Sequence, residues 1–367
     1  MKARLLKERR FLLLCAAFVA LALLGYLACR LAALWPELTE RLYSRGIYPV
    51  FAQFFSRVSG LMPCSLSELL LFCLPLLLVW QLVRLLRRRT NWLRCLAGLI
   101  ALCAGLYAVF SLGWAVNYSR LSYAQIAGLE VRDSTVEELE ALCLDLWEAA
   151  EAYRAQLTDS AQAYQTEEGV AETLSQVLQA YAVASERFAW LGGSYAAPKA
   201  ALLSLPLAYL NIAGIYSPFT FEAHVNALES SLLLPATACH EAAHLRGFAR
   251  EDEANYIAYV VCVASGDARF AYSGTLLALI HAGNALYDAD RAAYARLCAS
   301  YSDGLRADLQ SYNDNWAPYD GEAAEIQERV NDGYLKFNGQ SDGVRSYGRM
   351  VDLLLAEKRQ REGDDAA

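Results

Sequence analysis

An unbroken run of 19 apolar residues, Phe11–Cys29, constrains this chain more than any other feature of its sequence. At about 1.5 Å of rise per residue, a helix of that length crosses the roughly 30 Å of hydrocarbon in a bilayer. Two further apolar runs, Leu66–Leu86 and Leu96–Val116, are long enough as well. The sequence therefore predicts a membrane anchor at residues 1–120, with transmembrane helices at about residues 11–29, 66–86 and 96–116.

The first run has a second interpretation, because a secretory signal peptide also begins with basic residues. Five Lys or Arg residues stand in the first ten positions. However, the apolar core exceeds the roughly 7 to 15 residues of a signal peptide, and no small-x-small cleavage site precedes a polar segment. We therefore expect this run to remain in the protein as an anchor.

Basic residues in the short loops predict the orientation. A second group of five lies within Arg84–Arg94, whereas residues 30–68 carry four arginines spread over their length. Cytoplasmic loops carry an excess of Lys and Arg. The N-terminus and Arg84–Arg94 are therefore expected in the cytoplasm, and residues 121–357 are expected outside it.

The rest of the chain has a different composition. Residues 1–120 carry 15 Lys/Arg and 4 Asp/Glu, whereas residues 121–367 carry 17 and 36, which gives net charges of about +11 and −19. Nucleic acid is bound by clustered Lys and Arg, so this acidic part argues against a nucleic-acid partner. The ten cysteines include no Cys-x-x-Cys pair and predict no disulfide framework.

Apolar residues recur at helical spacing through most of residues 121–357, and strand patterns are scarce. Ser134-Thr135-Val136-Glu137 has the form of a capping box at a helix start. The best strand pattern is Leu207–Tyr216, between two prolines. We expect a mainly α-helical domain with one short strand or hairpin, followed by a polar tail at residues 358–367. Helices are predicted over Val170–Phe188, Pro235–Arg246, Glu251–Ala264, Thr275–Tyr287, Arg291–Tyr301 and Ala323–Val330.

The segment His240-Glu241-Ala242-Ala243-His244 predicts a metal site. Histidines four residues apart lie one turn apart on one helical face, so both imidazoles can bind one Zn²⁺. Glu241 projects about 100° further round the helix, beside the metal, where it can take a proton from water. The chain has only four histidines, so this spacing is not expected by chance. The other two, His224 and His281, are expected to be packed or solvated.

A zinc peptidase needs a third protein ligand and an open fourth position. Gly247 can end the motif helix, and Glu251 stands at the start of the next helix, where its carboxylate can reach the metal. Glu253 is the alternative ligand, although it projects about 200° away from Glu251 on the same helix. A third histidine ligand three residues after Gly247 is excluded, because Arg250 occupies that position.

Three further residues are candidates for substrate or transition-state contacts. Arg345 and Tyr347 could donate hydrogen bonds to the oxyanion of a tetrahedral intermediate, although a surface turn explains them nearly as well. Tyr216, at the end of the predicted strand, is the third candidate. That strand could bind an extended peptide by β-addition, or it could form an ordinary buried hairpin.

The completion of His-Glu-x-x-His by a glutamate on the following helix resembles the gluzincin class of zinc peptidases. Glu251-x-x-Ala254 is similar to the ExxAD element of membrane-bound gluzincins such as the CAAX-prenyl endopeptidases, with Asn255 in place of the aspartate. The chain also resembles a family of bacterial inner-membrane proteins labelled as a domain of unknown function, notably at residues 117–120, 214–220 and 334–339. This resemblance implies a gluzincin-like domain, a bacterial inner membrane location and zinc-peptidase activity, without indicating a substrate.

We therefore expect a membrane-anchored zinc metallopeptidase that acts on peptides or proteins of the membrane or envelope. Its zinc ligands would be His240, His244 and Glu251, and Glu241 would be the catalytic base. The alternative is a non-catalytic scaffold or sensor with a structural metal, which would need four protein ligands. A transporter is disfavoured, because no predicted span carries an ionisable residue near its middle. The lipid bilayer and a peptide or protein substrate are the expected partners.

Overall fold

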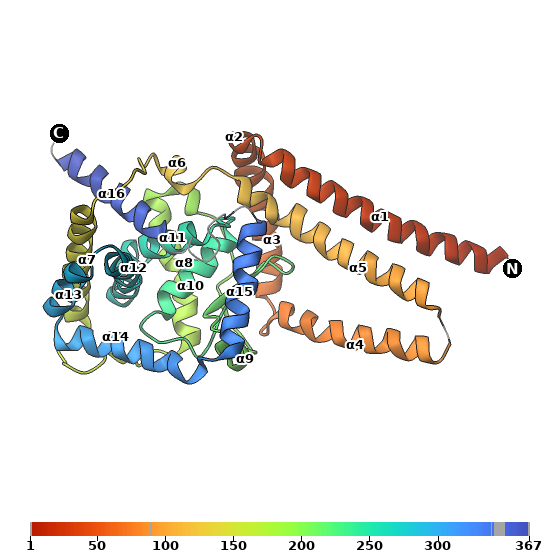
Figure 1. Ribbon diagram of the computed structural model, residues 1–367. Coiled ribbons are helices and arrows are strands. Elements are labelled where there is room, and N and C mark those ends of the chain that lie inside the picture. Colours follow the sequence, from red (N-terminus) through yellow and green to blue (C-terminus); the bar gives the residue numbers. More distant parts are fainter. Residues whose placement is uncertain (1, 89, 339, 341–348, 366–367) are drawn as a thin grey trace. The chain divides into compact units, whose positions relative to one another are not determined.

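The computed structural model describes residues 2–88, 90–338, 340 and 349–365 (Figure 1). The chain divides into two compact units. The first unit contains residues 1–121 together with residues 217–222, and the second contains residues 122–216 and 223–367. The fold is mainly α-helical with one small three-stranded sheet, as predicted.

Between Lys2 and Leu121, every described regular element of the first unit is a helix. Three helices, over Leu6–Ala32, Leu66–Leu86 and Trp92–Gly113, are long and apolar enough to span a membrane, which confirms that prediction. The third begins before the predicted Leu96, because Asn91 caps its start by accepting a hydrogen bond from the Arg94 amide. The elements are α1 (Lys2–Ala32), α2 (Pro36–Thr39), the π-helix η1 (Glu40–Ile47), α3 (Tyr48–Gly60), α4 (Leu66–Leu86), α5 (Trp92–Gly113) and the 3-10 helix η2 (Ala115–Ser119).

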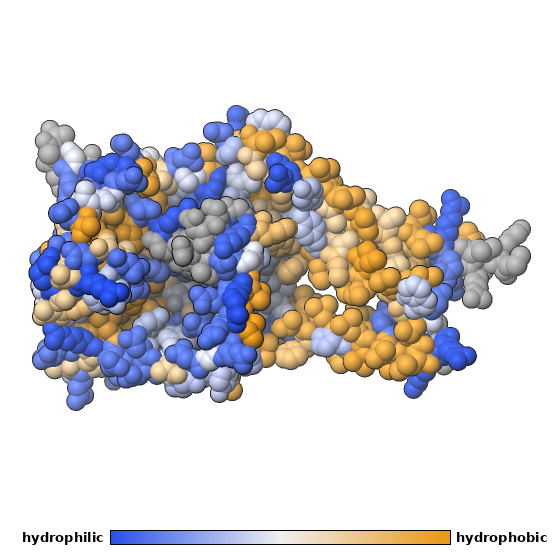
Figure 2. Space-filling view, viewed as in Figure 1, coloured by the Kyte–Doolittle hydropathy of each residue, from blue (hydrophilic) through white to orange (hydrophobic). Residues whose placement is uncertain are grey.

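Helices α1 and α5 pack closely against each other. A Cβ atom at Gly25 would lie 2.0 Å from Oγ of Ser111, so only glycine fits this position of α1. Small residues let helices approach closely inside a bilayer, where the hydrophobic effect does not drive them together. Figure 2 shows hydrophobic side chains over the surfaces of α1, α4 and α5, as expected of helices that face lipid.

The remaining elements include the sheet, whose strand order is β1-β3-β2. Strand β1 runs parallel to β3, with Lys199 opposite His224. The elements are α6 (Tyr123–Ala127), α7 (Val136–Leu157), α8 (Val170–Arg187), the 3-10 helix η3 (Ala189–Leu191), β1 (Lys199–Ala200), α9 (Ser204–Tyr209), β2 (Gly214–Ser217), β3 (Glu222–Val225), α10 (Leu234–Leu245), α11 (Glu251–Ala264), α12 (Ala268–Ala289), α13 (Arg291–Ser300), α14 (Asp303–Trp316), the 3-10 helix η4 (Ala317–Tyr319), α15 (Glu322–Phe337) and α16 (Met350–Asp365).

Helices α10 and α11 form the interior of the second unit (Figure 1). Every residue of α11 from Glu253 to Cys262 is buried, and helices α8, α10 and α12 pack against α11. A Cβ atom at Gly274 of α12 would lie 2.5 Å from Cβ of Cys262, so a glycine permits this close approach. Side chains on α10 and α11 are therefore held by rigid, packed elements.

The prediction of a strand over Leu207–Tyr216 is wrong for the first half of that segment. Residues Ser204–Tyr209 form helix α9, and only Gly214–Ser217 form a strand. Pro206 is tolerated in the first turn of a helix, where its missing N–H group has no intrahelical acceptor. The turn after α9 places Asn211 at a φ of 52°, a left-handed conformation that asparagine adopts more readily than most residues.

Two further expectations differ from the structure. The capping box lies one residue later than predicted: Oγ1 of Thr135 accepts from the Glu138 amide at 3.3 Å, and the Glu138 carboxylate accepts from the Thr135 amide at 3.0 Å. The polar residues after Lys358 continue helix α16 as far as Asp365. Arg359 binds Glu138 at 3.0 Å, so part of this polar stretch packs against the start of α7.

Candidate metal centre

The sequence around Gly247 explains how helices α10 and α11 come to face each other. Pro235 lies in the first turn of α10, and alanines fill much of the helix, which favours helix formation. Gly247 has a φ of 88°, and the Phe248 amide donates to the Ala243 carbonyl, as in a Schellman motif. The chain then reverses, and α11 begins at Glu251.

This reversal brings the three predicted ligands together. Oε2 of Glu251 lies 3.2 Å from Nε2 of His240 and 3.4 Å from Nε2 of His244. The side chains of Glu251, His240 and His244 are 13%, 12% and 9% exposed, so the group is nearly buried. One ligand atom from each residue lies within 4.8 Å of the others.

Hydrogen bonds on the outer side of each imidazole fix its orientation. Nδ1 of His240 donates to Oδ1 of Asn255 at 2.7 Å, and Nδ1 of His244 donates to the carbonyl oxygen of Phe248 at 2.7 Å. In a neutral ring, which is the form that binds a metal, a proton on Nδ1 leaves the lone pair on Nε2, the atom that lies nearest to Glu251. The amide oxygen of Asn255 thus accepts the hydrogen bond that orients the ring of His240.

The electrostatics of the group suit a cation. Burial alone would lower the pKa of His244, but the adjacent Glu251 carboxylate raises it to about 9. Burial would raise the pKa of Glu251, yet the two histidines hold it well below its usual range. Two nitrogen donors and one carboxylate oxygen are ligands that zinc prefers in catalytic sites. His240, His244 and Glu251 therefore fit a zinc ion, and they would leave one position open.

Glu241 lies beside this group and is 5% exposed. Burial raises the pKa of Glu241 to about 7, while the two histidines lower it. Its Oε2 atom is buried and has no hydrogen-bond partner among the residues that the structure describes. Buried polar atoms are nearly always paired, so this carboxylate oxygen can still accept a hydrogen bond from a bound molecule.

Strand β2 approaches Glu241 at Gly214. A Cβ atom at Gly214 would lie 2.5 Å from Oε1 of Glu241 and 2.7 Å from its Cγ, so a larger residue would displace the carboxylate. Gly214 was not among the site residues predicted from the sequence. An isolated glycine in a strand pattern was the available signal, because it often marks a close backbone approach.

The other candidates lie outside the ligand set. Glu253, the alternative ligand, accepts hydrogen bonds from the Tyr123 amide at 2.8 Å and from Arg250 at 2.7 Å, and is 2% exposed. Tyr216 is part of β2. Nδ1 of His224 lies 3.3 Å from the Ile215 carbonyl oxygen.

Burial, and then the nearby charge of His240, lower the pKa of His281 to about 4. Among the described residues, the only His, Cys, Asp and Glu side chains grouped closely enough to hold a metal ion are His240, His244 and Glu251. Arg345 and Tyr347 lie outside the described residues.

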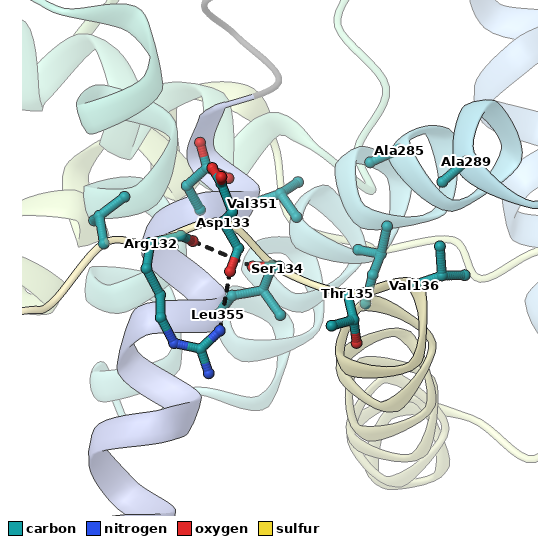
Figure 3. A pocket seen from close by; sticks show the side chains of 12 residues that line it. Arg132, Asp133, Ser134, Thr135, Val136, Ala285, Ala289, Val351 and Leu355 are labelled. Carbon is teal, nitrogen blue, oxygen red and sulfur yellow. Dashed lines mark hydrogen bonds between the residues drawn. The ribbon is translucent and has the colours of Figure 1, made fainter.

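A pocket of about 500 Å³ lies at a different place in the second unit (Figure 3). The loop before α7, the end of α12 and the start of α16 line it. Burial raises the pKa of its Asp352, and the charge of Asp133 adds to that effect. None of the predicted site residues lines this pocket, so it offers no support for the metal centre.

Comparison with known proteins identifies a family without giving a function. No curated protein and no solved structure matches the chain. Nothing in these comparisons shows a relationship to gluzincins. One family model, described as protein of unknown function (DUF3810), matches residues 43–355, so α1 lies outside the matched region. Because the match covers most of the chain, this protein belongs to the DUF3810 family.

Proposed function

We propose that this protein is a membrane-anchored zinc metallopeptidase. One observation carries the proposal: one ligand atom each of His240, His244 and Glu251 lies within 4.8 Å of the others, and the unpaired carboxylate oxygen of Glu241 lies on α10, the helix that carries both histidines. Structural zinc sites usually have four protein ligands, whereas catalytic sites have three and keep one position open. The three-residue set among the described residues therefore favours catalysis over a purely structural metal.

The proposed reaction is hydrolysis of a peptide bond. Zn²⁺ bound at this site would supply Lewis acidity, which polarises the peptide carbonyl and lowers the pKa of water. Glu241 takes a proton from the attacking water as the new C–O bond forms. It then delivers that proton to the amine nitrogen as the C–N bond breaks. A pKa of about 7 suits a group that must both accept and release a proton near neutral pH.

Strand β2 is the proposed binding edge for an extended substrate. It is an edge strand, since the order in the sheet is β1-β3-β2, and its Gly214 contacts Glu241. An extended peptide can add to such an edge through backbone hydrogen bonds. A peptide bound along β2 in this way would have its backbone beside the Glu241 carboxylate, which transfers the proton. We propose that the substrates are peptides or proteins of the membrane or envelope.

The spans and the basic loops support a proposal for the location. We propose that the three long apolar helices cross a bacterial inner membrane, with the N-terminus and Arg84–Arg94 in the cytoplasm. Residues after 121 would then lie outside the cytoplasm. A reporter that is active only outside the cytoplasm should work when fused after Asn117 and fail when fused at Arg87.

Glu241→Gln separates catalysis from metal binding. The variant should keep its zinc, because Glu241 is not a proposed ligand, and should lose hydrolysis of a quenched fluorescent peptide library by about 10²- to 10⁴-fold. Full-length protein in detergent is assayed for zinc content and peptide cleavage. Unchanged cleavage by Glu241→Gln would contradict the mechanism.

Glu251→Ala and Glu253→Ala form a matched pair on α11. Glu251→Ala should lose zinc and activity together. Glu253→Ala should keep its zinc, because that carboxylate binds the Tyr123 amide and Arg250 instead of the histidines. Loss of zinc from Glu253→Ala alone would transfer the ligand role to Glu253.

A further inference from the structure

Helix α3 has an apolar face that no described residue covers. Five large side chains on this face are exposed: Val50 (68%), Phe51 (51%), Phe54 (57%), Val58 (46%) and Leu61 (83%), the last at the C-cap. At about 100° per residue, these positions fall within an arc of roughly 100° on one side of the helix. A contiguous apolar face of this kind marks an interaction surface.

The opposite side of α3 is fixed inside the first unit. Tyr48, Ala52, Ser56 and Ser59 are buried, and they recur at helical spacing. The ring of Phe221 lies 6.2 Å from the ring of Tyr48 and stacks on Phe55 at 5.5 Å. Because this side is packed, the helix cannot rotate to bury its apolar face, and the face requires another partner.

The position of α3 in the first unit indicates what that partner is. The helix lies between the end of α1 and the start of α4, two helices long enough to span a membrane, and it runs crosswise to them (Figure 1). A helix that connects the same ends of two spans crosswise lies along the membrane surface. The apolar face of α3 is thus continuous along the chain with segments that face lipid.

The composition of α3 supports the same partner. Its sequence contains no Asp or Glu, and Arg57 is exposed beside the apolar arc. Amphipathic helices that lie in the membrane interface combine an aromatic and aliphatic face with basic residues, and they bury that face roughly 5–10 Å into the headgroup and acyl boundary. A long basic side chain can extend from such a face to the anionic headgroups.

We propose that α3 is an interfacial helix whose Val50, Phe51, Phe54, Val58 and Leu61 side chains insert into the lipid bilayer. Phe55 of α3 stacks on the ring of Phe221. The carboxylate of the next residue, Glu222, accepts hydrogen bonds from the amides of Leu66 and Ser67 at 3.2 and 3.0 Å. The segment Ser217–Glu222 that joins β2 to β3 is therefore anchored to membrane-associated helices. This inference rests on the first unit alone and does not depend on the proposed peptidase activity.

Photo-crosslinking tests this placement. Full-length protein carrying benzoylphenylalanine at position 54 is reconstituted into vesicles of phosphatidylethanolamine and phosphatidylglycerol, irradiated and analysed by mass spectrometry. A second variant carries the probe at position 58, on the same face, in case the first is poorly folded. The control carries it at Gln53, whose side chain projects about 100° away from that of Phe54.

We expect phospholipid adducts at positions 54 and 58 to exceed those at position 53 by about fivefold or more, because only the apolar arc enters the acyl region. A cross-linked dimer at 54 and 58 would instead identify a second copy of the chain as the partner and overturn the proposal. Equal lipid labelling at all three positions, or labelling at none, would overturn it as well.

Discussion

The Arg154–Asp308 pair and the His240–His244–Glu251 group are both buried in the second unit, but their surroundings differ. Nε of Arg154 donates to Asp308 at 2.7 Å, and its two terminal nitrogens donate to the carbonyl oxygens of Ser160 and Gln162. Asp308 also accepts from the Tyr164 amide at 2.6 Å and from the Tyr272 hydroxyl at 2.5 Å. This cluster is closed, because its charges are neutralised and bonded within the protein.

The histidine group is built in the opposite way. Its outer nitrogens are bonded to Asn255 and Phe248, while its inner atoms converge on one another and leave Glu241 with an unpaired oxygen. A closed cluster contributes to the stability of the fold, whereas an open one is suited to bind something. The contrast predicts that substitutions in the first cluster change unfolding and that substitutions in the second change metal binding.

The largest expected effect is on the closed cluster. Asp308→Ala leaves the Arg154 guanidinium buried without a counter-charge, which costs about 3–5 kcal/mol of unfolding free energy. Denaturant unfolding of the full-length protein in detergent measures this loss. Asp314→Ala, at an exposed position on the same helix, is the control and should change stability by less than about 0.5 kcal/mol. A loss of zinc without a loss of stability in Asp308→Ala would break the comparison.

Glu229 is another buried carboxylate, and it differs from Asp308 because no described cation pairs with it. It accepts from the Ser230 amide at 2.7 Å and lies 3.5 Å from the Thr237 hydroxyl. Burial raises the pKa of Glu229 from 4.5 to about 7. The folded state therefore favours the protonated acid. This contribution is fully present below about pH 4.5 and is lost as the pH rises through about 7.

The expected loss between pH 4.5 and pH 8 is up to about 3 kcal/mol. Glu229→Gln should remove this pH dependence, so that the variant is more stable than the wild type at pH 8. Unfolding of both proteins is measured at pH 5 and pH 8 with a chelator present, so that zinc binding does not contribute. Identical pH dependence in the two proteins would show that Glu229 is not the group that titrates.

A smaller effect is expected when the hydrogen bond between His240 and Asn255 is removed. Asn255→Ala removes the acceptor that orients His240 and should weaken zinc affinity about 10- to 100-fold. Asn255→Asp restores an acceptor and should keep affinity close to that of the wild type. Competition with a chromogenic chelator measures both values. Equal affinity in Asn255→Ala and the wild type would mean that packing alone orients the imidazole.

The sequence predicted the parts of this structure that depend on local patterns. Helix α11 has the predicted bounds, and α10 differs by one residue at each end, because Pro235 and Gly247 are strong local signals. The spans Leu66–Leu86 and Phe11–Cys29 could be predicted for the same reason, since the length of an apolar run can be read directly from the sequence.

The missed features depend on tertiary contacts. Leu207–Tyr209 belong to a short apolar run bounded by prolines, a pattern that does not distinguish a strand from a helix, and they form part of α9. Gly214 was not recognised, since its role depends on Glu241, which is 27 positions away in the chain. The polar residues of α16 appeared to be a tail, but Lys358 and Arg359 form ion pairs with Asp145 and Glu138 of α7.

Zinc content of the purified full-length protein shows whether His240, His244 and Glu251 bind a metal ion. Wild type, His240→Ala and His224→Ala are compared by elemental analysis after dialysis. We expect about one zinc per chain in the wild type and in His224→Ala, because His224 lies outside the ligand set, and almost none in His240→Ala. Wild-type protein that binds no zinc, or a His240→Ala variant that binds as much as the wild type, would contradict the proposed metal site.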